Sequence, residues 1–440
     1  MFDKYFQFGV ATSSYQIEGT QLGDEKVNSI WDAFSKKEGA IADGTDGSIA
    51  CEHLLRYKED IALIKELGVD TYRFSISWAR VFPMEGQVSN AGLDFYRNIL
   101  EELKGNGIKA SITMYHWDMP QWLYEKNKGW ADRETAYLFL EYAKLLFDNF
   151  DDYADSWVTF NEPFCSACLG YLSGKHAPGH QNAEEYLRAV HTINLAHGLA
   201  IRYYKSKYKK PIGIVLNVSP VYTVDNSFNN QIVRNIQDAL TNRMHLDPIF
   251  KGTYPIEFLA TFLDRVKDFS FIKEDDFQIC SERIDFLGIN YYTRTYINYD
   301  KDSAILIQRV KTDIKKTSMG WEVTPDGLYD IIHRIREDYT DIPIIITENG
   351  SAWEDKLTDG RVEDEDRVEY LNSHLKIVEQ LNAEGMNIAG YYAWSLLDNF
   401  EWADGYKMRF GLVYVDYETQ KRYPKKSYYR YKEIVEKRNL

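Results

Sequence analysis

Two short apolar segments, residues 157–163 (WVTFNEP) and 344–350 (IIITENG), each carry a glutamate at the point where a β-strand would end. If both strands belong to one barrel, Glu162 and Glu348 face each other across a single pocket although they lie far apart in the sequence. Hydrolysis of a glycosidic bond uses such a pair. One carboxyl group protonates the leaving oxygen, and the other faces the anomeric carbon, where positive charge develops. The two glutamates therefore predict chemistry on glycosidic bonds.

The elements that must position these glutamates recur along the whole chain. Short runs of β-branched and aromatic residues alternate with longer segments whose apolar residues have helical spacing. Strands are predicted at residues 6–12, 71–77, 110–114, 157–160, 212–216, 286–290, 344–347 and 389–394. This alternation, with nearly continuous apolar strands, favours a closed parallel barrel over an open sheet. The expected fold class is α/β, a (β/α)8 TIM barrel with long βα loops.

Helix ends can be predicted from glycines. A helix over residues 53–67 is expected to end at Gly68, because glycine readily adopts the left-handed conformation that follows many helices. By the same rule, a helix over residues 93–104 ends at Gly105.

The domain organisation is expected to be simple. No linker, low-complexity tract or internal repeat divides the chain, so residues 1–440 are predicted to form one domain. The residues beyond those that a minimal barrel needs are expected to lie in loops, of which residues 218–284 and 293–342 are the largest. Both follow the C-terminal ends of strands, where barrel enzymes build their sites.

The charge balance argues against nucleic acid as a partner. The chain has 52 Lys and Arg against 67 Asp and Glu, a net charge of −15, and the basic run at residues 205–210 fits a helix C-terminus. No apolar run approaches the roughly 20 residues of a membrane span, and the N-terminal residues lack the apolar core of a secretion signal. We expect a cytoplasmic protein that contacts neither nucleic acid nor membrane.

The cysteines predict neither disulfides nor a metal site. Cys51, Cys165, Cys168 and Cys280 are too few and too scattered for a disulfide framework in a chain of this length. The C-x-x-C at Cys165 and Cys168 lacks a second Cys or His pair, so buried, reduced thiols are favoured over a redox or zinc role. No cofactor or metal is expected, since the chain also lacks a G-x-G-x-x-G after a strand and a His/Asp cluster with ligand spacing.

Polar and aromatic residues are concentrated at the C-terminal ends of the predicted strands. In a closed barrel these ends all lie at the same opening. Several of these stretches resemble motifs of a known family: residues 8–19 (FGVATSSYQIEG), 72–78 (YRFSISW), 159–163 (TFNEP), 247–255 (DPIFKGTYP), 346–350 (ITENG) and 394–402 (WSLLDNFEW). Over nearly the whole chain, the sequence resembles the family 1 glycoside hydrolases, β-glucosidase-like retaining enzymes on a (β/α)8 barrel.

The resemblance implies separate roles for the two glutamates. Glu162 matches the family's general acid/base and Glu348 its nucleophile, which implies retention of anomeric configuration and carboxyl groups about 5 to 5.5 Å apart. Arg73 and Tyr292 match residues that hold the nucleophile, and Asn290 is expected to support them. Asn161 matches the donor to the sugar 2-hydroxyl.

The resemblance also implies a sugar pocket for a small carbohydrate substrate. The matching residues are Gln16, His116, Trp117, Trp394, Glu401, Trp402 and Phe410, with Trp321 as an aglycone platform. A subgroup that takes 6-phosphosugars carries Ser, Lys and Tyr where this chain has Glu401, Met408 and Phe410. A carboxylate at 401 would repel phosphate, so an unphosphorylated sugar is expected. Because Glu162 is not the Gln of the thioglucosidase subgroup, an O-glycosidase is favoured.

Several functional alternatives stay open at this level. The main prediction is a β-glucosidase acting on β-D-glucosides and short oligosaccharides such as cellobiose. A β-galactosidase or β-fucosidase is the main alternative, because the sequence does not reveal hydrogen-bond angles at C4 and C6. A sugar-binding barrel without turnover is disfavoured, since both carboxyl groups and their expected supports are present.

Overall fold

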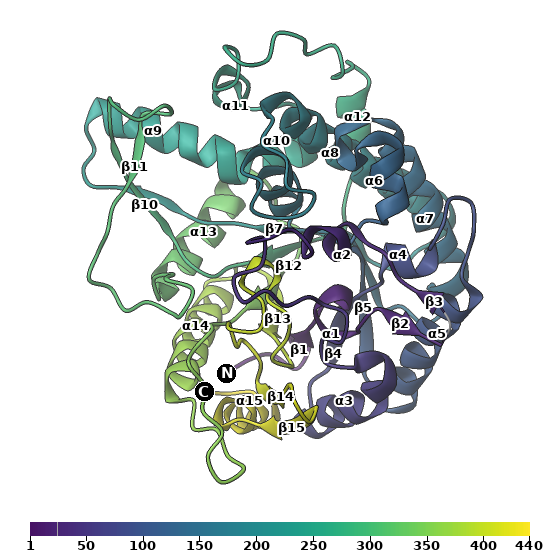
Figure 1. Ribbon diagram of the computed structural model, residues 1–440. Helices are drawn as coiled ribbons and strands as arrows, with labels where there is room; N and C mark the ends of the chain where they lie inside the picture. The colour runs from purple at the N-terminus through teal and green to yellow at the C-terminus, as the bar shows by residue number, and fades with distance from the viewer. Residues whose placement is uncertain (24) are drawn as a thin grey trace.

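The computed structural model describes residues 1–23 and 25–440 and contains a closed barrel of parallel strands (Figure 1). The barrel strands are β1 (Gln7–Ala11), β4 (Thr71–Ser75), β5 (Lys109–Tyr115), β6 (Ser156–Asn161), β7 (Ile212–Asn217), β9 (Phe286–Asn290), β12 (Ile344–Asn349) and β13 (Ile388–Trp394). Each strand pairs with the next along the chain, and β13 closes on β1 with Gly9 opposite Tyr392. The predicted fold class and every predicted strand are confirmed, and the strand ends differ by at most two residues.

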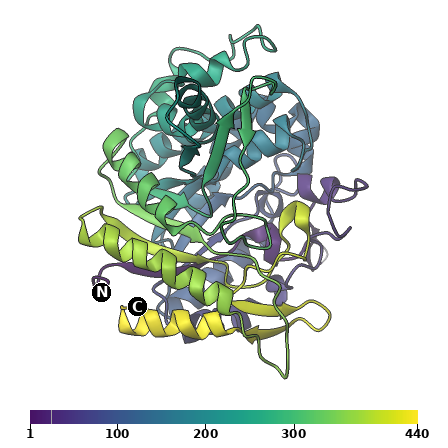
Figure 2. The same ribbon diagram turned by 90° about the vertical axis from the view of Figure 1, so that its left-hand side faces the viewer.

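Long helices surround the barrel. They are α3 (His53–Leu67), α5 (Asn90–Gly105), α7 (Glu134–Phe150), α8 (Ala183–Lys207), α13 (Pro325–Asp338), α14 (Glu365–Ala383) and α15 (Lys426–Lys437). Figure 2 shows α14 and α15 side by side along one flank, so the last helix of the chain completes the outer layer. Lys205 and Lys207 stand in the last turn of α8, where cations suit the helix dipole.

The predicted helix ends are partly correct. Helix α3 ends as predicted, and Gly68 adopts the left-handed conformation with φ of 79°. Helix α5 ends at Gly105 as predicted, but its start was predicted wrongly, and Gly105 is not left-handed. The helix begins at Asn90, because the Ser89 side chain accepts a hydrogen bond from a backbone N–H in the first turn, and it continues through Gly105. The left-handed residue after α5 is Gly107, with φ of 71°.

The two large insertions contain regular structure rather than loops alone. Residues 218–284 include β8 (Val221–Thr223), α9 (Phe228–Asp238), α10 (Met244–Lys251), α11 (Ile256–Ala260) and α12 (Asp276–Cys280). β8 pairs with β10 (Thr295–Tyr299), and β10 with β11 (Ile307–Arg309), in a small sheet outside the barrel. This sheet and α9 stand out from one side of the molecule in Figure 1.

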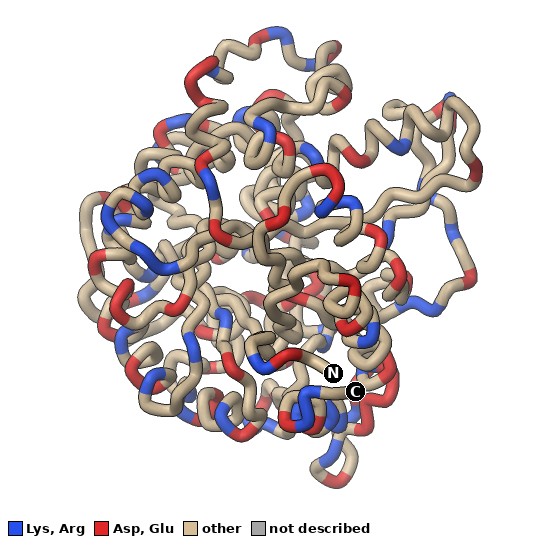
Figure 3. Tube along the Cα trace, turned by 180° about the vertical axis from the view of Figure 1, so that it is seen from behind, with Lys and Arg blue, Asp and Glu red and all other residues tan. Residues whose placement is uncertain are grey.

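Short elements complete the chain near the ends of the barrel. They are α1 (Ser14–Ile17), β2 (Gln21–Leu22), β3 (Glu25–Lys26), α2 (Ile30–Phe34), α4 (Trp78–Val81), α6 (Gln121–Asn127), β14 (Val413–Asp416) and β15 (Lys421–Pro424). Lys and Arg are interspersed with Asp and Glu over the outer helices (Figure 3). Within residues 1–23 and 25–440, none of the helices combines the length and apolarity needed to cross a membrane.

Apolar side chains pack together on the barrel strands. A buried cluster joins Val158, Val215, Phe286, Ile345 and Tyr392, one from each of five neighbouring strands. Space between these strands is tight, because a Cβ atom added at Gly288 would lie only 2.5 Å from a methyl group of Val215. Such packing fixes the strands, and with them the side chains at their C-terminal ends.

Candidate active site

A cavity of about 310 Å³ lies at the C-terminal ends of the barrel strands. Every site residue predicted from the sequence lines it except Gln16 and Arg73. The lining members are His116, Trp117, Asn161, Glu162, Asn290, Tyr292, Trp321, Glu348, Trp394, Glu401, Trp402 and Phe410. Arg73 and Gln16 are buried beneath these residues and contact them through hydrogen bonds.

Irregular backbone aims both glutamates into the cavity. The pairing of β6 with β7 shifts register between Val158 and Asn161, and the pairing of β12 with β9 shifts between Ile346 and Glu348. Such a bulge re-aims a side chain at a strand end, because it interrupts the strict alternation of the pleat. Glu162 follows with φ of 46°, a left-handed conformation that is unfavourable for a residue with a side chain.

Two strong donors hold Glu348. Arg73 Nη1 donates to Oε1 at 2.7 Å, and the Tyr292 hydroxyl donates to Oε2 at 2.6 Å. Burial raises the pKa of Glu348, and the Arg73 guanidinium and the Tyr292 hydroxyl oppose that rise because they stabilise the ionised form. Burial and the neighbouring glutamates also keep the pKa of Tyr292 well above its ordinary value, so its phenol stays a neutral donor.

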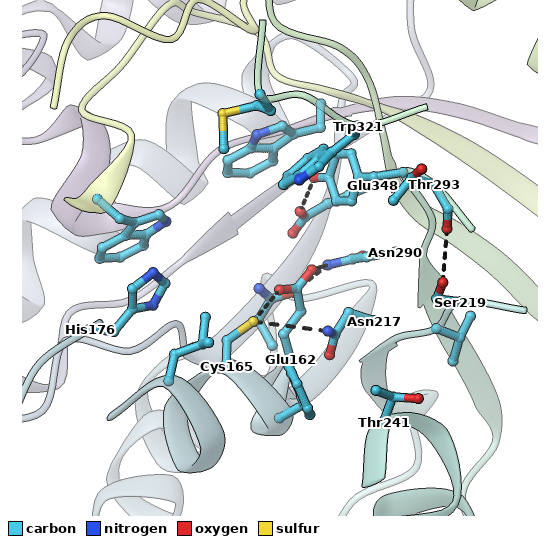
Figure 4. A pocket seen from close by; sticks show the side chains of 18 of the residues that line it. Glu162, Cys165, His176, Asn217, Ser219, Thr241, Asn290, Thr293, Trp321 and Glu348 are labelled. Atoms are coloured by element: carbon cyan, nitrogen blue, oxygen red, sulfur yellow. Dashed lines mark hydrogen bonds between the residues drawn. The ribbon is translucent and has the colours of Figure 1, made fainter. Parts of the chain in front are cut away.

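Weaker donors hold Glu162. Asn290 Nδ2 donates to Oε1 at 2.7 Å, and Cys165 Sγ lies 3.1 Å from Oε2 (Figure 4). Burial, and next the negative charge of Glu348, raise the pKa of Glu162 to about 7. The two carboxyl groups therefore differ in kind, since at neutral pH Glu162 can hold a proton that Glu348, beside its cation, gives up more readily.

Asn161 connects both glutamates to His116. Its Oδ1 accepts from Arg73 Nη2 at 2.7 Å and from Asn290 Nδ2 at 3.0 Å, so its Nδ2 must face His116 Nε2 at 3.0 Å. His116 Nε2 is then an acceptor, and the ring proton sits on Nδ1. Burial, and next the charge of Arg73, lower the pKa of His116 well below its ordinary value. Its buried Nδ1 has no partner among the described residues, which leaves a donor for a ligand.

A third carboxyl group stands on another wall of the cavity. Gln16 Nε2 donates to Glu401 Oε2 at 3.2 Å and to Asn399 Oδ1 at 2.9 Å, which fixes Glu401. Burial, and next the nearby Asp404, raise the pKa of Glu401 well above its ordinary value. An uncharged hydroxylated ligand suits this wall better than an anion does.

Aromatic rings form the remaining walls. The His116 ring lies nearly parallel to Trp394 and Trp402, at interplanar angles of 20° and 16°. Trp321 lies 5.2 Å from Tyr292 between ring centroids. Trp117 donates its indole N–H to the Asn161 carbonyl oxygen at 2.9 Å, so it supports a strand end as well as lining the cavity. Flat apolar faces of this kind bind the C–H faces of a ring-shaped polar ligand.

Other lining residues escaped the sequence analysis. They include Phe164, Cys165, Leu169, His176, Asn217, Thr241, Arg294, Arg309, Met319 and Asp404. Asn217 ends β7, so the same strand-end rule could have found it. Cys165 and Leu169 lie on a π-helical segment, Cys165–Leu172, that begins three residues after Glu162, and such segments are common at functional sites. In the part of the chain that the structure describes, no group of three or more His, Cys, Asp or Glu could hold a metal ion.

Comparison with known proteins identifies the family to which this site belongs. The family model for glycosyl hydrolase family 1 matches residues 1–440. The chain belongs to glycosyl hydrolase family 1. Among relatives of this family 1 hydrolase, Beta-glucosidase A of Thermotoga maritima is 42% identical, with 100% of this chain and 98% of that protein covered. A bifunctional beta-D-glucosidase/beta-D-fucosidase of Bifidobacterium breve is 38% identical, with 99% and 98% covered.

Solved structures agree with this assignment. The crystal structure of a β-glucosidase from Exiguobacterium marinum matches with a TM-score of 0.98 at 46% sequence identity, covering 100% of this chain and 99% of that chain. The family 1 hydrolase described here therefore has the same fold as an enzyme of known structure, over nearly the whole of both chains. The predicted resemblance to family 1 and the expectation of a hydrolase are confirmed.

Proposed function

We propose that this family 1 hydrolase is a retaining β-glucosidase that acts on unphosphorylated β-D-glucosides, with residues 1–440 forming one catalytic domain. The observation that carries the proposal is the contrast between two buried carboxyl groups in one cavity. Glu348 is held by a guanidinium and a phenol, whereas Glu162 is held by an amide and a thiol. One carboxyl group is thereby suited to act as a nucleophile, and the other to carry a proton.

The reaction proceeds in two displacements. In the first, a Glu348 oxygen attacks the anomeric carbon while the bond to the aglycone oxygen breaks, and that oxygen takes the proton of Glu162. In the second, Glu162 accepts a proton from water as the water oxygen attacks the same carbon, and the bond to Glu348 breaks. Esterification of Glu348 removes its negative charge, which lowers the pKa of Glu162 between the two steps and suits it to act as a base.

The walls of the cavity support the choice of sugar. Asn161 has a second amide hydrogen for the 2-hydroxyl group, and His116 Nδ1 has a free proton for a neighbouring hydroxyl. Glu401, oriented by Gln16, accepts hydrogen bonds from hydroxyl groups on the far side of the ring. Because Glu401 and Asp404 lie close together, a phosphate group at that wall would meet like charge or unsatisfied acid groups.

Hydrolysis of a chromogenic aryl β-D-glucoside, followed with the wild type and two variants, tests the proposal. Glu348→Gln is expected to lose nearly all turnover. Glu162→Ala is expected to lose more rate on poor leaving groups than on activated ones, and azide is expected to restore part of its activity by replacing water in the second step. NMR of the first-formed sugar should show the β-anomer. Full activity of Glu348→Gln, or release of the α-anomer, would overturn the assignment.

A second candidate activity is β-fucosidase or β-galactosidase hydrolysis by the same residues. The relative from Bifidobacterium breve that is named for both glucosidase and fucosidase activity supports the fucosidase candidate. A fucoside lacks the 6-hydroxyl, so its binding depends less on Glu401 than glucoside binding does. Comparing kcat/KM for aryl glucoside, galactoside and fucoside in the wild type and in Glu401→Gln tests this. A uniform loss on all sugars would argue against Glu401 as the residue that selects among them.

A further inference from the structure

The thiol of Cys165 touches the carboxyl group of Glu162 inside the cavity. We propose that Cys165 is a positioning residue for Glu162, whose thiol donates a hydrogen bond to the oxygen that carries the catalytic proton and so sets how strongly that proton is held. The proposal rests on the acid/base role proposed above for Glu162. Its geometric basis is a distance of 3.1 Å between Sγ and Glu162 Oε2 (Figure 4).

Backbone geometry brings the thiol to this place. The Cys165 N–H donates to the Glu162 carbonyl oxygen at 2.9 Å, which closes a tight turn between the end of β6 and the π-helical segment. The turn folds residue 165 back over the carboxyl group of residue 162. Cys165 is 8% exposed, so its thiol faces the cavity from a buried position and does not exchange its contacts with bulk water.

Hydrogen-bond partners identify which Glu162 oxygen carries the proton. Asn290 Oδ1 accepts from the Thr347 hydroxyl at 2.8 Å, so the Asn290 amide is oriented and its Nδ2 faces Glu162 Oε1. An amide N–H₂ group is a donor only, so Oε1 must accept. The amide is also a stronger donor than the Cys165 thiol, so it favours the carbonyl oxygen of the protonated acid at Oε1 and leaves the hydrogen on Oε2, the oxygen beside Cys165.

The sulfur is itself held as a neutral donor. Burial, and next the charge of Glu162, raise the pKa of the Cys165 thiol well above its ordinary value, so it keeps its hydrogen. On its other side, Asn217 Nδ2 lies 3.9 Å from Sγ and donates to it (Figure 4). Since the amide occupies the acceptor side of the sulfur, the S–H bond is directed toward Glu162.

A donor at this oxygen favours the ionised form of the acid. The thiol thus opposes the effects of burial and of Glu348, which raise the pKa of Glu162. Removing it should raise that pKa further, so Glu162 stays protonated to a higher pH. The alkaline limb of the kcat/KM profile reports the acid of the free enzyme, so this limb should move with the thiol.

The chain offers a matched control for the test. Cys168 stands one turn further along the same π-helical segment, and among the described residues it makes no hydrogen bond to either glutamate and lies outside the cavity. Burial raises the pKa of its thiol to about 12, so it too is a neutral thiol. Cys168→Ala therefore removes a thiol from the same segment without removing a contact to Glu162.

The experiment measures kcat/KM for an aryl β-D-glucoside against pH in Cys165→Ala, Cys165→Ser, Cys168→Ala and Glu162→Gln. Cys165→Ala is expected to move the alkaline limb to higher pH by about 0.5 pH unit, which corresponds to the free energy of a weak hydrogen bond to a charged group. Cys165→Ser, which keeps a donor, should hold the limb at or below its wild-type position. Cys168→Ala should leave it unchanged.

The outcomes separate the two proposals. If Glu162→Gln removes the alkaline limb and Cys165→Ala leaves it in place, the role of Cys165 is overturned and that of Glu162 stands. The same holds if Cys168→Ala shifts the limb as much as Cys165→Ala, because the effect then comes from the segment and not from the contact. If the limb survives in Glu162→Gln, the assignment of the acid fails, and the inference about Cys165 fails with it.

Discussion

The hydroxyl of Tyr292 should set the acid limb of the pH profile. It donates at 2.6 Å to Oε2 of the buried Glu348, so its removal by Tyr292→Phe leaves one carboxylate oxygen without that donor. A hydrogen bond to a charged group contributes about 1.5 to 3 kcal/mol, which corresponds to a pKa change of about 1 to 2 units. The donor stabilises the ionised form, so its loss raises the pKa of Glu348.

In the nucleophile role proposed for it, Glu348 must be ionised, so the acid limb of kcat/KM should move to higher pH by the same amount. Below that limb, activity should fall about 10- to 100-fold, whereas near the optimum the loss should be smaller. Tyr291→Phe is the matched control, because it removes a hydroxyl from the neighbouring tyrosine, which is buried and donates to the Thr324 carbonyl oxygen at 2.6 Å, away from Glu348. An unmoved acid limb in Tyr292→Phe, or an equal shift in Tyr291→Phe, would refute this reasoning.

Three further changes test the supports of the site. Asn161→Ala should lower kcat by about 10²-fold or more while KM changes less, because the contact proposed between Asn161 and the sugar 2-hydroxyl would strengthen in the transition state. Steady-state kinetics at the pH optimum would check this, and an effect on KM alone would contradict it. Trp321→Ala should raise KM for cellobiose by about tenfold, through loss of a stacking face, and leave the release of a small alkyl aglycone nearly unchanged. Lys425→Met should lower unfolding stability by about 3 to 5 kcal/mol in denaturant titration, because the wholly buried ammonium pairs with Asp355 and Asp398; the exposed Lys426→Met should have a much smaller effect.

Sequence patterns predicted the barrel because its strands are buried on both sides. A strand that packs against helices outside and side chains inside reads as a continuous apolar run, and each such run proved to be a strand. The small sheet formed by β8, β10 and β11 was not predicted, because its strands are short and partly exposed and one pairs with a segment far away in the chain. The left-handed residue after α5 was missed because either Gly105 or Gly107 could adopt that conformation, and the sequence alone does not decide between them.

The site was predicted where its residues stand at strand ends and missed where they stand on turns. Residues such as His116 and Asn290 follow apolar runs, so their convergence follows from the barrel alone. Cys165 reaches Glu162 only because a turn folds back after β6, and nothing in the letters C-S-A-C distinguishes the contacting thiol from the other. Arg309 reaches the cavity from β11, whose position depends on long-range pairing.

The different tasks proposed for the two glutamates follow from their hydrogen-bond donors rather than from their burial. Both carboxyl groups are almost inaccessible to water, at 6% exposure for Glu162 and 3% for Glu348, so desolvation acts on both alike. Glu348 has a cation and a phenol within 2.7 Å, and these compensate a negative charge in a buried site. Glu162 has only an amide and a thiol as donors, and these stabilise a negative charge on its carboxyl group less. When one negative charge must be shared between two buried acids, it therefore resides on Glu348, and the proton remains on Glu162, as the acid role proposed for Glu162 requires.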